Sequence, residues 1–252
     1  MDNLIRVSLS GISKKFIVGH KKKKSALARV LSIFQMRNHK EESIVLNDVS
    51  FNLNEGDNLG IIGRNGSGKS TLLRIIAGIY RPSNGFIDTK GNLVYISGFG
   101  QGLNKKLSMR ENIFLVSSLM GLGQKDIKNY FNEIVIFSGL KDYIDMRLDK
   151  FSSGMVSRLV FSIGIFCLIH KKIDILLLDE VMGGGADIDF QEKAIKKMEE
   201  LIKGGSSVIL VSHNLNQIKK YCNIVIWLED GKIIKMGNPS EVIKDYENSS
   251  KK

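Results

Sequence analysis

Residues that could hold a phosphate group lie together in one glycine-rich segment. Residues 63–70 read Gly-Arg-Asn-Gly-Ser-Gly-Lys-Ser and directly follow the apolar run 59–62. Glycines let backbone N–H groups approach phosphate oxygens closely, and a helix that begins here adds partial positive charge. Lys69 is placed to reach the β and γ phosphates of a nucleotide, and the Ser70 hydroxyl to ligate Mg²⁺. The segment predicts a nucleotide site rather than a plain glycine-rich turn, with contacts from Gly63, Arg64, Asn65, Gly66, Ser67, Gly68, Lys69, Ser70 and Thr71.

Two carboxylates supply the second half of this chemistry. Asp179 and Glu180 follow the apolar run 175–178, and ligands of open α/β sheets bind where such strands end. Asp179 is predicted to hold Mg²⁺ directly or through water, and Glu180 to orient and deprotonate an attacking water. Alone, an Asp-Glu pair after a strand more often begins an ordinary loop. Together with the phosphate segment, it predicts ATP hydrolysis.

The apolar runs that must position these residues are typical of a mainly parallel α/β sheet. Each of the runs is short, apolar and separated from the next by helical patterns, which favours buried strands. An alternating pattern from Val45 to Leu53 and a hairpin around Glu229-Asp230-Gly231 add an antiparallel part. Residues from about 97 to 160 have helix-period patterns and predict a helical insertion. The expected buried strands are 59–62, 93–96, 175–178 and 208–211, with a helix at 71–77 and a terminal helix from 238–240.

Composition limits the class of protein. The 252 residues are 43% hydrophobic, enough for one substantial core. The longest apolar stretch, 159–169, is too short to span a bilayer. The N-terminus lacks the layout of a secretory signal, so we expect the chain to stay in the cytosol. Cys167 and Cys222 lack the spacing of a metal site or a disulfide framework, and we interpret both as small core residues.

The segment 151–155, Phe-Ser-Ser-Gly-Met, links the chain to a known family. It resembles the signature loop of ABC ATPases, and the form with two serines and a methionine is similar to that of polysaccharide exporters for O-antigen, capsule and teichoic acid. In isolation, Ser152 or Ser153 could simply cap a helix. The position of the segment, between the helical insertion and the strand that ends at Asp179, favours the resemblance.

The resemblance, which covers almost the whole chain, implies further site residues. His213 matches the switch histidine that contacts the γ phosphate and supports Glu180. Phe16 matches the aromatic residue on which the adenine stacks, although a core phenylalanine is the alternative. Gln101 is the candidate for the coupling-loop glutamine and a metal contact, although it lies two residues from the expected place. Asp187 is the candidate dimer-contact aspartate, in a loop one residue longer than the family pattern.

The resemblance implies a P-loop NTPase of the ABC type in a single domain, residues 1–252. Some exporters of this family carry an additional C-terminal carbohydrate-binding domain, and we expect none here. Two copies would each hold ATP and Mg²⁺ between one phosphate loop and the Ser152, Ser153 and Gly154 of the other copy. Separate transmembrane permease subunits would be the partners, and a lipid-linked polysaccharide the cargo. The implied location is peripheral, on the cytoplasmic face of the inner membrane. A drug or lipid cargo is one alternative, and a soluble ABC ATPase that acts on nucleic acid or ribosomes is another.

The net charge of +11 is concentrated in one segment. Residues 14–40 hold nine Lys or Arg and no acid, which leaves +2 on the rest of the chain. For this reason we do not expect a nucleic-acid partner for the body of the protein. Residues 21–42 combine lysines with apolar residues at helical spacing, and we interpret them as a basic amphipathic insertion. One hypothesis places it at the anionic leaflet or at a lipid pyrophosphate head group, and the alternative is a solvated surface helix.

Overall fold

The computed structural model describes residues 4–18, 41–97, 102–169, 172–180 and 188–249. Along the chain the strands are β1 (Ile5–Val18), β2 (Glu41–Asn54), β3 (Asn58–Ile62), β4 (Asn84–Thr89), β5 (Leu93–Ile96), β6 (Ile175–Asp179), β7 (Ser207–Val211), β8 (Ile224–Glu229) and β9 (Lys232–Gly237). The α-helices are α2 (Lys69–Ile76), α3 (Met109–Leu119), α4 (Gln124–Ser138), α5 (Ser153–Ile169), α6 (Ile188–Ile202), α7 (Leu215–Tyr221) and α8 (Pro239–Ser249).

The larger sheet confirms the predicted parallel core. Its order is β5-β6-β7-β3-β8-β9, and every pairing except that of β8 with β9 is parallel. All five residues of β6 and of β7 are buried. Leu176 and Leu178 belong to one hydrophobic cluster and Ile175 and Leu177 to another, on the opposite face. A strand covered on both faces has no polar alternation, which is why these strands read as continuous apolar runs.

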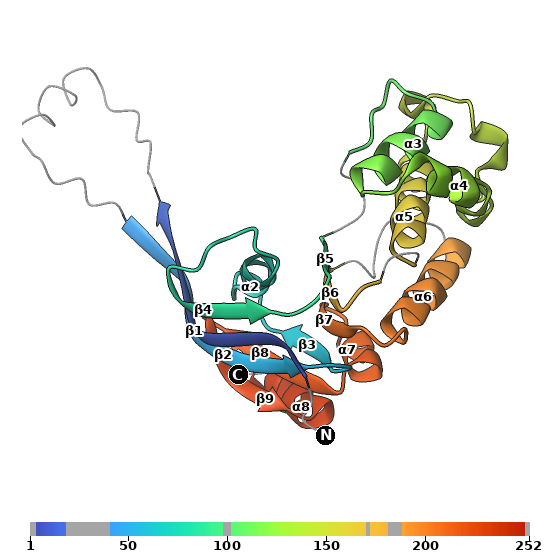
Figure 1. The fold of residues 1–252 in the computed structure, drawn as a ribbon. Coiled ribbons are helices and arrows are strands. Elements are labelled where there is room, and N and C mark those ends of the chain that lie inside the picture. The colour runs from blue at the N-terminus through green and yellow to red at the C-terminus, as the bar shows by residue number, and fades with distance from the viewer. Residues whose placement is uncertain (1–3, 19–40, 98–101, 170–171, 181–187, 250–252) are drawn as a thin grey trace, which may run out of the picture.

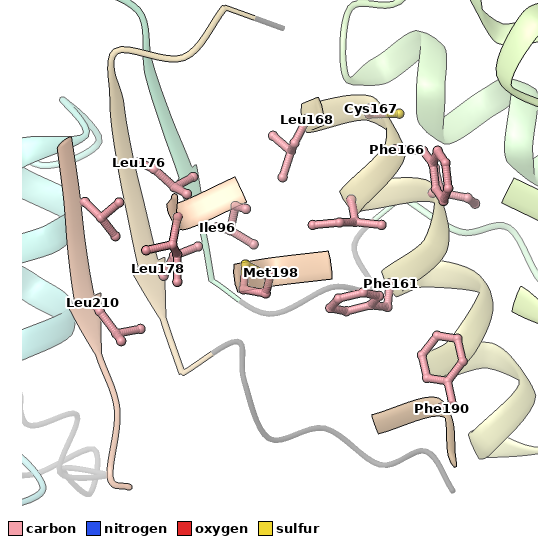
Figure 2. Packing of buried hydrophobic residues seen from close by; sticks show 14 of the residues in the cluster. Ile96, Phe161, Phe166, Cys167, Leu168, Leu176, Leu178, Phe190, Met198 and Leu210 are labelled. Carbon is pink, nitrogen blue, oxygen red and sulfur yellow. The ribbon is translucent and has the colours of Figure 1, made fainter. Parts of the chain in front are cut away.

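Helices cover the two faces unequally. α2 packs on one face together with the smaller, antiparallel sheet, whose order is β2-β1-β4. Residues of α3 to α8 form the cluster on the other face, and Figure 2 shows Leu178 of β6, Met198 of α6 and Phe161 of α5 following one another from the sheet toward the helices. α5 is buried from Leu159 to Leu168 without interruption, because α3, α4 and α6 pack against it. The apolar stretch is therefore a core helix.

Strand β2 begins earlier than the sequence indicated. The predicted insertion 21–42 ends inside it, since Glu41 and Glu42 pair with Val18 and Ile17 of β1. Backbone ladder hydrogen bonds hold these residues, so the strand does not need an apolar pattern there. Of the predicted insertion, residues 21–40 lie outside the described residues, and so do Gln101 and Asp187.

Helices α3 and α4 lie in the range predicted for the helical insertion, and α5 continues past its expected end to Ile169. Figure 1 shows α3, α4 and α5 in a lobe on the other side of β5, β6 and β7 from α2. Both cysteines are buried, as predicted, and burial raises the pKa of the Cys222 thiol to about 12. Within the described part of the chain, no helix has the length and apolar character needed to cross a membrane.

Candidate active site

The segment between β3 and α2 wraps around the ammonium group of Lys69. Lys69 Nζ donates hydrogen bonds to the carbonyl oxygens of Gly63 and Arg64, both at 2.8 Å. Gly68 has φ of 105°, and a Cβ at this position would lie 2.8 Å from the carbonyl oxygen of Val45. Only glycine fits such a conformation at such a close approach. The loop is therefore held in a tight turn whose carbonyl oxygens bind the Lys69 ammonium group.

The groups in this loop suit a phosphate. Burial lowers the pKa of Lys69, and the charges of Glu180, Asp179 and Glu229 oppose this effect. The Ser67 hydroxyl is buried and has no hydrogen-bond partner in the structure, and such a group is costly to leave unsatisfied. The start of α2 at Lys69 adds the partial positive charge of a helix N-terminus. The segment thus brings a cation, a hydroxyl without a partner and a helix N-terminus together, and these groups suit an anion.

Strand β6 delivers Asp179 to the start of α2. The Ser70 hydroxyl donates to Asp179 Oδ1 at 3.1 Å, and the Tyr95 hydroxyl donates to Asp179 Oδ2 at 3.1 Å. Asp179 is buried, with 8% of its surface exposed. A hydroxyl and a carboxylate side by side are hard oxygen ligands of the kind that Mg²⁺ prefers. The residues present therefore fit the cation that the sequence predicted.

Tyr95 was not predicted from the sequence. It lies in β5, a strand that the sequence did locate, and β5 pairs with β6 in parallel, with Tyr95 opposite Leu177. The available signal was that the carboxyl ends of neighbouring parallel strands meet at one edge of a sheet. A tyrosine in a strand is otherwise an ordinary residue.

The side chains of Glu180 and His213 are in contact with each other, and Glu180 directly follows Asp179 in the chain. His213 Nε2 lies 2.8 Å from Glu180 Oε1, and about half of each side chain is exposed, 52% for His213 and 50% for Glu180. Glu180 has φ of 55°, a conformation that non-glycine residues seldom adopt. Its backbone N–H donates to the carbonyl of Val211 at 3.0 Å, which ties it to β7. The strained backbone is thus secured by the neighbouring strand, and it presents the carboxylate to solvent next to the histidine.

Phe16 lies outside both hydrophobic clusters, so the core alternative does not describe it. Its ring meets Tyr80 edge-on, with centroids 5.6 Å apart and an interplanar angle of 76°. Lys14 Nζ lies 5.0 Å from the centroid of the Phe16 ring. The half-buried Phe16 ring therefore packs against a second aromatic side chain.

The 151–155 segment has a different environment. Ser152 caps α5, because its side-chain oxygen accepts the N–H of Met155 at 3.2 Å and its carbonyl accepts that of Val156 at 3.0 Å. Ser152 and Ser153 are exposed, and Gly154 is partly buried. α5 belongs to the lobe that lies apart from α2 in Figure 1. One chain does not bring these residues onto its own phosphate loop.

Comparison with known proteins agrees with this site. The family described as "ABC transporter" matches residues 46–183. The O-antigen export system ATP-binding protein RfbB of Klebsiella pneumoniae is 36% identical over 203 residues, covering 81% of this chain and 80% of that protein. The teichoic acids export ATP-binding protein TagH of Lactococcus lactis is 36% identical over 245 residues, covering 97% of this chain and 51% of that protein.

Solved structures agree on the fold. The ATP-binding subunit of an ABC transporter superposes with a TM-score of 0.69 at 19% identity, covering 95% of this chain and 92% of that one. The ATP-binding cassette MJ0796, solved as a dimer in a post-hydrolysis state with ADP and phosphate, gives a TM-score of 0.66 at 20% identity, covering 92% of this chain and 98% of that one. The phosphate loop, the acidic strand end and these matches agree. The chain belongs to the ABC transporter family, as an ATPase domain that binds nucleotide.

Proposed function

We propose that this chain is the nucleotide-binding subunit of an ABC exporter that moves a lipid-linked polysaccharide across the cytoplasmic membrane. The observation that carries the ATPase part is the convergence of Lys69, Ser70, Asp179, Glu180 and His213 at one edge of the parallel sheet. The cargo rests on the relatives, which are named for O-antigen and teichoic acid export.

The side chains have separate roles in this proposal. Lys69 exchanges its two backbone carbonyl contacts for the β and γ phosphates of ATP, and the glycine-rich backbone binds the same groups. Ser70 and Asp179 hold Mg²⁺, with Gln101 as a further contact. The bound cation neutralises charge that develops on the phosphates. Phe16 offers a ring face to the adenine.

Hydrolysis in this proposal depends on Glu180. Its carboxylate accepts a proton from the attacking water, and it is solvent-exposed enough for a water to reach it. His213 Nε2 lies 2.8 Å from Glu180 Oε1, and in this proposal it donates a hydrogen bond that fixes the direction of the carboxylate. Because Glu180 also hydrogen-bonds β7 through its backbone, the base and the histidine keep a defined separation.

A second copy completes the site in this proposal. Ser152, Ser153 and Gly154 of one copy contact the γ phosphate held by the other, and Asp187 lies at the dimer contact. Transmembrane permease subunits bind the helical lobe, so the chain is held at the cytoplasmic face of the membrane without spanning it. ATP binding favours the closed dimer, and hydrolysis releases it, which is a population shift driven by differential affinity.

The test uses the chain in its complete transporter, in cells that carry the Lys69→Ala variant in place of the normal protein. We expect loss of surface polysaccharide, accumulation of its lipid-linked precursor on the inner side, and loss of ATP hydrolysis by the purified complex. Normal surface polysaccharide together with lost hydrolysis would contradict the cargo. Normal hydrolysis would contradict the ATPase role of Lys69. The hypothesis for the basic insertion has its own test, replacement of Lys21, Lys22, Lys23 and Lys24 by Gln, which should lower export and leave basal hydrolysis intact.

A further inference from the structure

The two oxygens of Asp179 are held by two different side chains. Ser70 donates to Oδ1 and Tyr95 to Oδ2, both at 3.1 Å. With both oxygens bonded, the carboxylate has a fixed rotation about its last side-chain torsion, a torsion that is otherwise broad. Oδ1 is thereby directed to the Ser70 hydroxyl, the other group proposed to bind Mg²⁺.

A tyrosine is suited to this task in a way that a cation is not. The Tyr95 phenol is an uncharged hydrogen-bond donor, and in the structure it donates to Asp179 Oδ2. A neutral donor directs Asp179 without cancelling its charge. An arginine or lysine on the same oxygen would neutralise the carboxylate and compete with the metal ion for it.

Arg74 interacts with both Tyr95 and Tyr80. It lies in the last turn of α2 and donates a hydrogen bond to the Tyr80 hydroxyl at 3.5 Å, and its interactions with Tyr95 and then Tyr80 raise the pKa of Arg74. A positive charge beside the Tyr95 phenol polarises its O–H bond and so strengthens the hydrogen bond to Asp179. The positive charge thus acts on the carboxylate through a neutral group.

Arg74 also reaches the other end of the nucleotide site. The Tyr80 ring that it contacts meets the Phe16 ring edge-on at 5.6 Å, and the Arg74 guanidinium carbon lies 5.8 Å from the Tyr80 centroid. A continuous run of contacts therefore joins Phe16 to Asp179 through Tyr80, Arg74 and Tyr95. α2, which follows the phosphate loop, is the element that carries its central member.

We propose that Tyr95 is a positioning residue that orients Asp179 for Mg²⁺, and that Arg74 couples this orientation to the aromatic platform at Phe16. This inference rests on the proposed function, because it assumes that Mg²⁺ binds at Asp179 and that the adenine of ATP stacks on Phe16. Arg74 affects Mg²⁺ binding only through Tyr95, whereas it affects adenine binding through Tyr80.

The test measures binding rather than hydrolysis. A fluorescent non-hydrolysable ATP analogue is bound to the full-length chain first in EDTA and then during a Mg²⁺ titration. For Tyr95→Phe we expect about tenfold more Mg²⁺ at half-saturation, the usual size of a change in a group that orients a metal ligand. Affinity for the analogue in EDTA should stay unchanged, since the phosphate loop and the ring face are intact.

A matched control is available between α6 and α7, at residues that are not among the proposed site residues. Tyr221 donates its hydroxyl to the carboxylate of Glu199 at 2.7 Å, so Tyr221→Phe removes the same kind of bond away from the site. We expect no change in the Mg²⁺ titration for this variant. An equal shift in both variants would mean a general structural effect and would overturn the positioning role.

Arg74→Gln supplies a second, independent variant. We expect it to raise the Mg²⁺ requirement and also to weaken binding in EDTA, because it loosens both Tyr95 and Tyr80. In the double variant with Tyr95→Phe, the Mg²⁺ shift should equal that of Tyr95→Phe alone, which is the signature of action through Tyr95. Additive shifts would overturn the coupling.

The outcomes separate this inference from the proposed function. If the unaltered protein shows no Mg²⁺-dependent binding of the analogue, the proposed function fails. If it does, and Tyr95→Phe titrates like the unaltered protein, only the positioning role is wrong.

Discussion

The predicted site residues lie in two groups, one at the edge of the parallel sheet and one at the start of α5. The two groups differ in whether their side chains bond to one another. At the sheet edge, Ser70, Asp179 and Tyr95 are tied by hydrogen bonds, and Glu180 contacts His213. At the start of α5, Ser152 makes the bonds of a helix cap and its surroundings are exposed. The first group is organised within one chain, whereas the second presents its serines outward.

The difference indicates where each half of the chemistry comes from. Side chains that must hold a cation and a water need fixed geometry, and strand ends supply it. The start of α5 has a simpler task in the proposal. It only has to present hydrogen-bond donors to the γ phosphate that the other copy holds, once the two copies come together. The comparison therefore supports a site shared between two chains.

The largest expected effect comes from the sheet edge. Glu180→Gln keeps the size of the side chain and its backbone bond to Val211, but an amide cannot accept the proton. We expect steady-state hydrolysis to fall by about 10²- to 10⁴-fold, the usual contribution of a general base. Affinity for ATP, measured with the fluorescent analogue, should stay within about twofold, because the loop around Lys69 is unaltered. Normal turnover would show that the base lies elsewhere.

A smaller effect separates the two roles of Ser152. Aspartate caps helices as well as serine does, so Ser152→Asp should leave the free energy of unfolding unchanged in a urea titration. It also places a negative charge where a phosphate of the other copy is proposed to bind. We therefore expect hydrolysis to fall about 100-fold, comparable to the loss of a donor to the transition state.

Ser152→Ala is the companion variant. It removes the cap, so the free energy of unfolding should fall by about 1 kcal/mol, while hydrolysis falls less than in Ser152→Asp because no charge is added. If Ser152→Asp hydrolyses ATP normally, Ser152 is a cap and nothing more.

The smallest effect concerns the link between α6 and α7, the helices that follow the strands ending near Glu180 and His213. Hydrogen bonds from Lys220 and then Tyr221 lower the pKa of Glu199 from 4.5 to about 2. A carboxylate with a lowered folded pKa stabilises the protein above its unfolded pKa, and the effect is lost as the pH falls through the folded value.

Glu199→Gln tests this link. We expect a lower urea midpoint than the unaltered protein at pH 7, and a difference that shrinks as the pH falls from about 4.5 toward 2. Hydrolysis at pH 7 should change little, since Glu199 is not among the site residues. A difference between the two proteins that is constant with pH would contradict the assigned cause.

The parallel strands could be predicted from the sequence because both faces of β6 and β7 are covered. Strands of this kind appear in the sequence as short, continuous apolar runs. The sequence did not locate β4, where Phe86 is exposed, Ile87 is half-buried and Asp88 faces outward. An edge strand of this kind forms by pairing its backbone with β1 rather than by burial. Long-range pairing of this type leaves no local pattern.

The site shows the same division. Lys69, Ser70 and Asp179 could be predicted because they belong to motifs in which spacing itself carries the chemistry. Tyr95 and Arg74 belong to no motif, and their roles arise only when β5 and α2 are brought beside β6. Ser152 differs from both groups, because it belongs to a motif but its bonds within one chain are those of a helix cap. The contact proposed for it is with a second chain.

The most direct test of the shared site measures the mass of the Glu180→Gln protein in solution by light scattering, with and without ATP and Mg²⁺. We expect ATP to convert monomer to dimer. We expect the added substitution Gly154→Asp to keep it monomeric at unchanged affinity for ATP, since a charge near the start of α5 opposes a phosphate held by the other copy. Dimerisation that is equal in both proteins, or loss of ATP binding by the Gly154→Asp monomer, would contradict the shared site.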